Sequence, residues 1–118
     1  MKIMFASDIH GSAYYCRKML DIYSESGAGR LVILGDLLYH GPRNDLPREY
    51  APKEVIAMLN PLKNQIYAIR GNCDTEVDQM VLEFPILADY GLLVLEGKVF
   101  YATHGHVYNQ DRLPPLQD

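Results

Sequence analysis

Three short, continuous apolar runs occur in the first part of the chain. They cover residues 2–7, 31–34 and 65–69, and each is bounded by polar or glycine residues. Unbroken apolar runs of this length are typical of strands in a parallel sheet that is covered on both faces. Residues 2–7 are accordingly predicted to form a buried strand.

Apolar residues recur at helical spacing in the two segments between these runs. Ser12 is placed to cap a helix that runs to about Ser26, and Gly27 suits its end. Pro52 is placed to open a second helix that Pro61 would end. The order strand–helix–strand–helix–strand predicts three parallel strands joined by right-handed crossovers.

The pattern changes after the third strand. A short helix is predicted over residues 75–81, and residues 92–95 and 99–102 are predicted to form an antiparallel hairpin around the turn 96–98. A long segment, residues 37–51, separates the second strand from its helix and contains no predicted element. Loops of that length in compact domains are often functional.

Composition restricts the class of protein. The 118 residues are 48% hydrophobic and 22% charged, which is ordinary for a single globular domain, here residues 1–118. No apolar run approaches the roughly 18 residues of a membrane span. Ser7 interrupts the first apolar run too early for a secretory leader. Cys16 and Cys73 lie far apart, so reduced thiols in the cytoplasm are expected.

Charge argues against one class of partner. The formal net charge is −4, from 15 acidic and 11 basic residues, and apart from the pair at residues 17–18 the basic residues are scattered singly. A general nucleic-acid-binding protein carries a basic face. Binding to long nucleic acid is therefore not expected.

Good metal ligands follow each predicted strand. Asp8 and His10 come after the first strand, Asp36 after the second, Asn72 after the third and His104 after the hairpin. Ligands bind outside the carboxyl ends of the strands in open α/β sheets, so these side chains can converge. Each has an ordinary alternative as a turn, a cap or a structural histidine, but their order along the chain favours one common site.

The donor set indicates which metals and which substrate would fit. Carboxylate oxygens, imidazole nitrogens and one amide oxygen suit Mn, Fe, Zn, Ni or Co. Asp36 has two oxygens and can serve two ions at once. The positive charge of two divalent ions exceeds the negative charge of two aspartates. The centre would therefore be positive, which suits an anionic phosphate ester. A pair of metal ions about 3.5–4 Å apart binds ester oxygens and acidifies a bound water into a nucleophile.

These residues resemble the blocks of the calcineurin-like metallophosphoesterase superfamily, D-x-H, G-D, G-N-[H/C]-D and H-G-H, and within it those of YfcE-type bacterial phosphodiesterases. The resemblance implies an α/β fold, in which a metallophosphoesterase β-sandwich is flanked by helices and N-terminal parallel strands precede an antiparallel hairpin. It also implies metal-dependent hydrolysis of a small phosphodiester by water activated at a dinuclear centre, with two divalent ions and Mn as the expected metal. The matching stretches are residues 5–11, 32–36, 40–44, 70–74 and 103–106.

The resemblance also implies a role for each ligand. Asp8 and His10 would ligate the first metal, and Asp36 would bridge both metals. Asn72 and His104 would ligate the second metal.

Three neighbouring residues keep alternative roles. His106 is not usually a ligand in this block, and a supporting or substrate-facing role fits it. Many relatives carry a histidine general acid where this chain has Cys73, and a thiol, with a pKa of about 8.5, is a poorer proton donor. Cys73 is therefore either a catalytic group or inert packing. Asp74 either supports catalysis or caps the following helix, and we favour the cap.

Two loop residues are candidates for substrate binding. His40 and Arg43 follow the bridging aspartate, and arginine matches phosphate geometry. The alternative is an ordinary solvated loop. Arg70, at the end of the third strand, is expected to form a salt bridge and to take no part in catalysis.

One family block does not occur in this sequence. Relatives carry G-H-x-H after a late strand, and its histidines complete both metal sites. The sequence, which ends at Asp118, is either a fragment or a genuinely short protein, and we favour a fragment with an incomplete second sheet. We expect the isolated chain to have weak or no activity. Such a sheet would expose an apolar face of the hairpin and a free strand edge, which favours a homo-oligomer.

Two other functions use the same fold. Some members of the superfamily are catalytically impaired binding scaffolds, and others are phosphomonoesterases or nucleases acting at the same site. All five ligands are chemically competent, which favours an enzyme over a scaffold. Without the histidine that relatives carry, a phosphodiester with a good leaving group would be the least affected substrate.

Overall fold

A parallel sheet of three strands lies at the centre of the structure, a computed structural model that describes residues 2–115. Its strands are β1 (Ile3–Ala6), β2 (Arg30–Ile33) and β3 (Ile66–Ala68), in the order β1-β2-β3. Both neighbouring pairs are parallel, which confirms the predicted arrangement.

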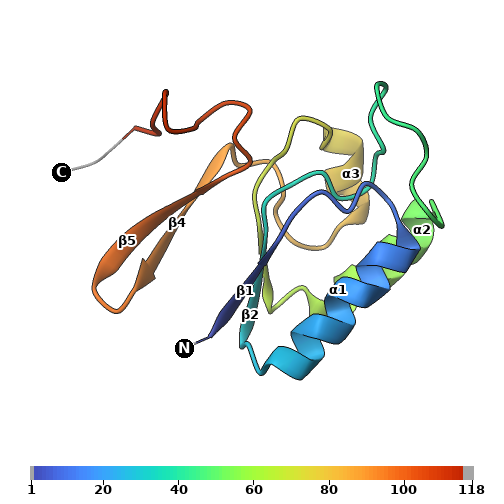
Figure 1. Cartoon of the computed structure of the whole chain (residues 1–118), viewed down its shortest axis with the longest axis horizontal. Coiled ribbons are helices and arrows are strands. Elements are labelled where there is room, and N and C mark those ends of the chain that lie inside the picture. The colour runs from blue at the N-terminus through green and yellow to red at the C-terminus, as the bar shows by residue number, and fades with distance from the viewer. Residues whose placement is uncertain (1, 116–118) are drawn as a thin grey trace.

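Together with a shorter helix, α2 (Pro52–Leu59), a long helix covers one face of this sheet (Figure 1). This helix, α1 (Ala13–Ser26), begins where the sequence predicts, because the Ser12 hydroxyl oxygen accepts a hydrogen bond from Tyr15 N. It ends at Gly27, which has a φ of 75° and adopts this left-handed conformation without a Cβ clash.

The two shorter helices begin and end at recognisable residues. α2 (Pro52–Leu59) starts at its proline, and a 3₁₀ turn (Asn60–Leu62) follows it, so Pro61 lies within that turn. α3 (Glu76–Val81) has Thr75 as its N-cap. None of the helices in residues 2–115 combines the length and hydrophobicity that crossing a membrane requires.

A two-stranded hairpin lies on the other side of the central sheet (Figure 1). It consists of β4 (Tyr90–Leu95) and β5 (Lys98–Thr103). The turn contains only Glu96 and Gly97, both with positive φ, a geometry that matches the twist of the flanking strands. Lys98 therefore belongs to a strand, and its placement in the turn was wrong.

The buried core lies between the sheet and the helices, whereas the hairpin side is more open. Phe5 on β1 is 51% exposed, so the prediction of a fully buried first strand was wrong. The reason is that β1 is the edge of the sheet and the hairpin covers it only in part. On the hairpin, Leu92, Val94 and Val99 are also exposed. The core cluster includes Cys16, Leu31, Ile33, Val55, Leu59 and Ile66.

The long loop after β2 is fastened at its far end to the start of α1. Ala13 N donates to Glu49 O at 2.9 Å, and the Ser12 hydroxyl donates to Arg48 O at 2.5 Å. The Arg48 guanidinium lies over the Tyr14 ring, 3.8 Å from its centroid. This end of the loop is therefore held by both backbone and side-chain contacts.

Candidate metal centre

Backbone hydrogen bonds join the segments that follow β1 and β2. Asp8 N donates to Gly35 O at 3.0 Å, and His10 N donates to Asp36 O at 2.8 Å. Asp8, His10 and Asp36 have φ values of 60°, 51° and 59°. Residues other than glycine rarely adopt this left-handed backbone conformation. Backbone strain of this kind is found mainly at functional sites.

The structure brings all five predicted ligands together. Asp36 Oδ2 lies 3.6 Å from His10 Nε2 and 3.2 Å from His104 Nε2. His10 Nε2 is 3.1 Å from Asp8 Oδ1 on one side of the cluster. His104 Nε2 is 3.1 Å from Asn72 Oδ1 on the other side. Asp36 thus lies between the two halves of the cluster.

A backbone carbonyl orients each of the two histidines. His10 Nδ1 lies 2.9 Å from Tyr39 O, and His104 Nδ1 lies 2.6 Å from Leu34 O. A carbonyl oxygen only accepts hydrogen bonds, so each Nδ1 carries a proton and each Nε2 of a neutral ring presents a lone pair. Each Nε2 faces oxygen acceptors. The lone pair of the nitrogen and those of the oxygens repel one another unless a positive charge lies between them. Histidines that bind metals are commonly oriented in this way.

Charge and burial act differently on the two aspartates. Burial raises the pKa of the Asp36 carboxyl, and the nearby carboxylates of Asp74 and Asp8 raise it further. Burial also acts on Asp8, but a hydrogen bond from the Ser7 hydroxyl and the nearby His104 ring outweigh it, so the pKa of Asp8 is lowered. Asp8, the more exposed of the two, is therefore the more readily ionised, and a bound cation would favour ionisation of both carboxyl groups.

A cavity of about 270 Å³ opens beside the ligand cluster. One wall comes from the ends of the strands, and the other comes from the part of the long loop that we call the loop tip (residues 41–46). The cavity lining is polar and comprises Asp8, His10, Asp36, Asn72 and Cys73 with Gly41, Pro42, Arg43 and Asn44.

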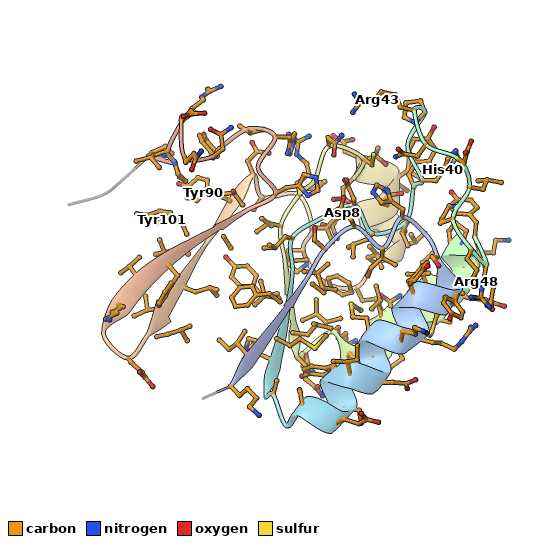
Figure 2. The ribbon with its side chains drawn as sticks, viewed as in Figure 1. Asp8, His40, Arg43, Arg48, Tyr90 and Tyr101 are labelled. Atoms are coloured by element: carbon orange, nitrogen blue, oxygen red, sulfur yellow. The ribbon has the colours of Figure 1, made fainter. Side chains whose placement is uncertain are left out.

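Arg43 contributes a positively charged side chain to the cavity lining. It lies at the loop tip, above the level of Asp8, while Arg48 lies at the fastened end of the loop (Figure 2). Its charge acts on the Cys73 thiol within the same cavity. Asn44 also lines the cavity and donates to His40 O at 2.9 Å. Asn44 was not among the predicted site residues, although it lies in the stretch 40–44 that resembles the family blocks.

The two other candidate substrate residues lie outside this lining. The His40 ring packs between the Tyr39 and Tyr50 rings, with centroid distances of 4.8 and 5.2 Å. His106 is exposed, and its ring centroid is 5.3 Å from that of His104. Both residues are therefore neighbours of the site in this structure, and their contact with substrate stays a prediction.

Cys73 lies beside the proposed ligands. Its ligand atom and those of His10 and Asp36 all lie within 4.8 Å of one another, as do those of Asp8, Asp36 and His104. Burial raises the pKa of the Cys73 thiol, and neighbouring carboxylates raise it further. Both effects favour the protonated thiol, and its part in catalysis stays a prediction.

Asp74 does not cap α3, and our preference for that role was wrong. Thr75 caps the helix, with Asp78 completing a reciprocal pair of hydrogen bonds. The Asp74 carboxylate is instead turned inward to the backbone of the strand ends. The expected salt bridge of Arg70 is confirmed, since its guanidinium contacts Asp89 Oδ1 at 2.8 Å.

Comparisons with known proteins agree with this geometry. The family model of the calcineurin-like phosphoesterases matches residues 1–117. The chain belongs to the calcineurin-like phosphoesterase family. It is 52% identical over 116 residues to phosphodiesterase YfcE of Escherichia coli K12, and equally to the YfcE proteins of E. coli O6:H1 and O157:H7.

The family fold is also confirmed by a solved structure. The structure of YfcE, described as a phosphoesterase from E. coli, superimposes with a TM-score of 0.94 at 51% identity, over 99% of this chain and 64% of that one. The metallophosphoesterase fold predicted from the sequence is therefore correct. The chain spans 63% of the length of the curated relatives that it matches.

Proposed function

We propose that the ligand cluster holds two divalent metal ions and serves the hydrolysis of a small phosphodiester. The observation that carries this proposal is the orientation of His10 and His104, whose Nδ1 atoms are bound to carbonyl oxygens and whose Nε2 atoms face oxygens of Asp36 and its neighbours. The donor set of two carboxylates, two imidazoles and one amide fits Mn²⁺, with Ni²⁺, Fe²⁺, Zn²⁺ and Co²⁺ as alternatives.

Each ligand has a distinct place in this proposal. Asp8 and His10 would hold one ion, Asn72 and His104 the other, and Asp36 both. Such ions supply positive charge for the phosphoryl oxygens and a lowered pKa for bound water. The protein itself orients both imidazoles through backbone carbonyls and, at Arg43, provides a cation on the opposite wall of the cavity. A small cavity of this polarity suits a compact anionic ester.

The assay of metal binding and hydrolysis also distinguishes the two alternative functions. Metal binding without hydrolysis would support a scaffold, and faster hydrolysis of a monoester would support a phosphomonoesterase. A cytoplasmic location and a homo-oligomer also stay predictions.

Removal and return of metal ions test the proposed function directly. We expect the EDTA-treated chain to bind Mn²⁺ by calorimetry and to hydrolyse bis(p-nitrophenyl) phosphate weakly at most, and only after Mn²⁺ is restored. The same assay on a version lengthened with the G-H-x-H block of its relatives shows how much activity depends on that block. A folded chain that binds no Mn²⁺, in either version, would refute the proposal.

Arg43 gives a separate prediction about substrate binding. A hydrogen bond to a charged group contributes about 1.5–3 kcal/mol, so Arg43→Ala is expected to raise KM for the diester by about tenfold or more. We expect a smaller change in kcat, because Arg43 lies opposite the ligands. Steady-state kinetics of the lengthened version provide the measurement.

Arg48→Ala is the matched control, since Arg48 belongs to the same loop but stacks on Tyr14 at its fastened end. Equal KM values for the Arg43 variant, the Arg48 variant and the unsubstituted protein would exclude Arg43 from substrate binding.

A further inference from the structure

The Asp74 carboxylate is buried and is bound to the backbone at the ends of two strands. Only 5% of the residue is exposed. Its Oδ2 accepts hydrogen bonds from Asp36 N and Gly71 N, both at 2.7 Å, and its Oδ1 accepts one from Leu37 N at 3.0 Å. One side chain thus links the segment after β2 to the segment after β3.

These hydrogen bonds stabilise the unusual backbone conformation of Asp36 and its buried N–H group. Its φ of 59° lies in the left-handed region, and an aspartate in this conformation needs surrounding contacts to hold it. Asp36 is also 2% exposed, and a buried N–H without an acceptor is costly. Asp74 supplies the acceptor for Asp36 N and for the next N–H along the chain.

A carboxylate at position 74 also has a cost. The negative charges of Asp74 and Asp36 are close enough for Asp74 to raise the pKa of the Asp36 carboxyl. An acceptor without charge would avoid this repulsion. However, a carboxylate has acceptor sites for all three N–H donors, whereas an asparagine amide offers one oxygen and would point an NH₂ group at the remaining donor or donors. The observed contacts therefore explain why an acid stands here.

Asp74 does not reach the cavity, and this separates it from the ligands. The cavity lining contains Asp36, Asn72 and Cys73 but not Asp74. Its contacts through Oδ1 and Oδ2 all run to backbone N–H groups. A direct role in proton transfer to a substrate is therefore not supported by its position.

We infer that Asp74 is a positioning residue that fixes the Asp36 carboxylate between His10 and His104. This inference rests on the proposed function, because Asp36 is the ligand proposed to serve both metal ions. The backbone of Asp36 is held by Asp74, and its Oδ1 is held by Cys73 N at 2.8 Å, which leaves Oδ2 directed at the two imidazoles. Both ends of the residue are thereby fixed.

Asp74→Asn tests this inference with little change in side-chain volume. Loss of an outer hydrogen-bond partner typically lowers metal affinity by about 10–100-fold, and we expect a decrease in that range for Mn²⁺ in calorimetry. Electron paramagnetic resonance provides a second measurement. Coupled signals from two neighbouring Mn²⁺ ions are expected to give way to signals of isolated Mn²⁺ as the shared carboxylate shifts.

Asp78→Asn is the matched control, because its carboxylate also accepts a backbone N–H, that of Thr75 at 3.2 Å, but at the start of α3. This variant is expected to lose helix stability and to keep the Mn²⁺ affinity and the spectrum of the unsubstituted chain. A purely structural role for Asp74 predicts the same behaviour for Asp74→Asn. Unchanged affinity and coupled signals in the folded Asp74 variant would therefore overturn the inference.

A measurement without metal separates this inference from the proposed function. In nuclear magnetic resonance of the metal-free chain, Asp74→Asn should speed amide exchange at Asp36 and Leu37 and shift the ring signals of His10 and His104. If the unsubstituted chain binds no Mn²⁺ in either its isolated or its lengthened version, the proposed function fails, and these ring signals alone decide the positioning role. Unshifted ring signals would then overturn it.

A second variant covers the case in which Asp74→Asn does not fold. Asp74→Ser leaves room for water and retains a hydroxyl acceptor for one N–H. The same ring shifts are expected in this variant, and a folded Asp74→Ser chain with the ring signals of the unsubstituted chain would also overturn the inference.

Discussion

Asp36→Asn is expected to abolish the proposed metal-dependent hydrolysis while leaving the metal-free fold intact. The amide oxygen can still accept from Cys73 N, but the shared negative charge is lost. We expect Mn²⁺ affinity and hydrolysis to fall by more than about 100-fold, beyond the range that follows loss of an outer partner. Calorimetry and the diester assay on the lengthened version measure both effects.

The same substitution is not expected to lower the stability of the metal-free chain at pH 7. Burial and the neighbouring carboxylates raise the pKa of Asp36, so its charged form is disfavoured in the folded state and contributes no stability above its ordinary titration range. Thermal unfolding tests this point. Asp21→Asn, an exposed acid on α1, is the control for the change in net charge. Retention of Mn²⁺ binding by Asp36→Asn would contradict the proposed shared ligand.

Gly71→Ala is expected to damage both the site and the fold through a steric clash. A Cβ at this position would lie 2.3 Å from Asp36 Oδ1 and 2.8 Å from Asp36 N. Overpacking of a buried site costs about 1–3 kcal/mol, and we expect the upper part of this range because the clash includes backbone. Urea unfolding measures the stability, and calorimetry measures the loss of Mn²⁺ affinity.

Gly29→Ala isolates the clash from the general effect of adding a methyl group. Within residues 2–115, nothing lies within 4 Å of a Cβ at Gly29, and neither glycine requires a positive φ. This control is expected to behave like the unsubstituted chain or to be slightly more stable. If Gly71→Ala matched Gly29→Ala in stability and affinity, the close approach of the two strand ends would not matter for the site.

The sequence predicted the ligand cluster because its members follow a topological rule. Asp8, Asp36 and Asn72 come directly after strands whose parallel order could be read from apolar runs, so their meeting at one sheet edge followed. The cap at Ser12 and the stop at Gly27 followed from local chemistry in the same way.

The failed predictions depend on contacts between distant residues. The apolar run of β1 does not reveal that the strand lies at an edge, so Phe5 was expected to be buried. Asp74 and Thr75 are both good caps, and only the hydrogen bonds from Asp36 N and Gly71 N to Asp74 show that Asp74 turns inward while Thr75 caps the helix.

The way the long loop is fastened has a consequence for how such a site can evolve. Its far end is bound through Ser12 and Ala13, next to the ligand segment, by contacts that include backbone donors and acceptors. The loop tip contributes one cavity wall but none of the five proposed ligands. Insertions and substitutions between residues 42 and 46 can therefore reshape one wall of the cavity while the contacts that orient the five proposed ligands are inherited unchanged.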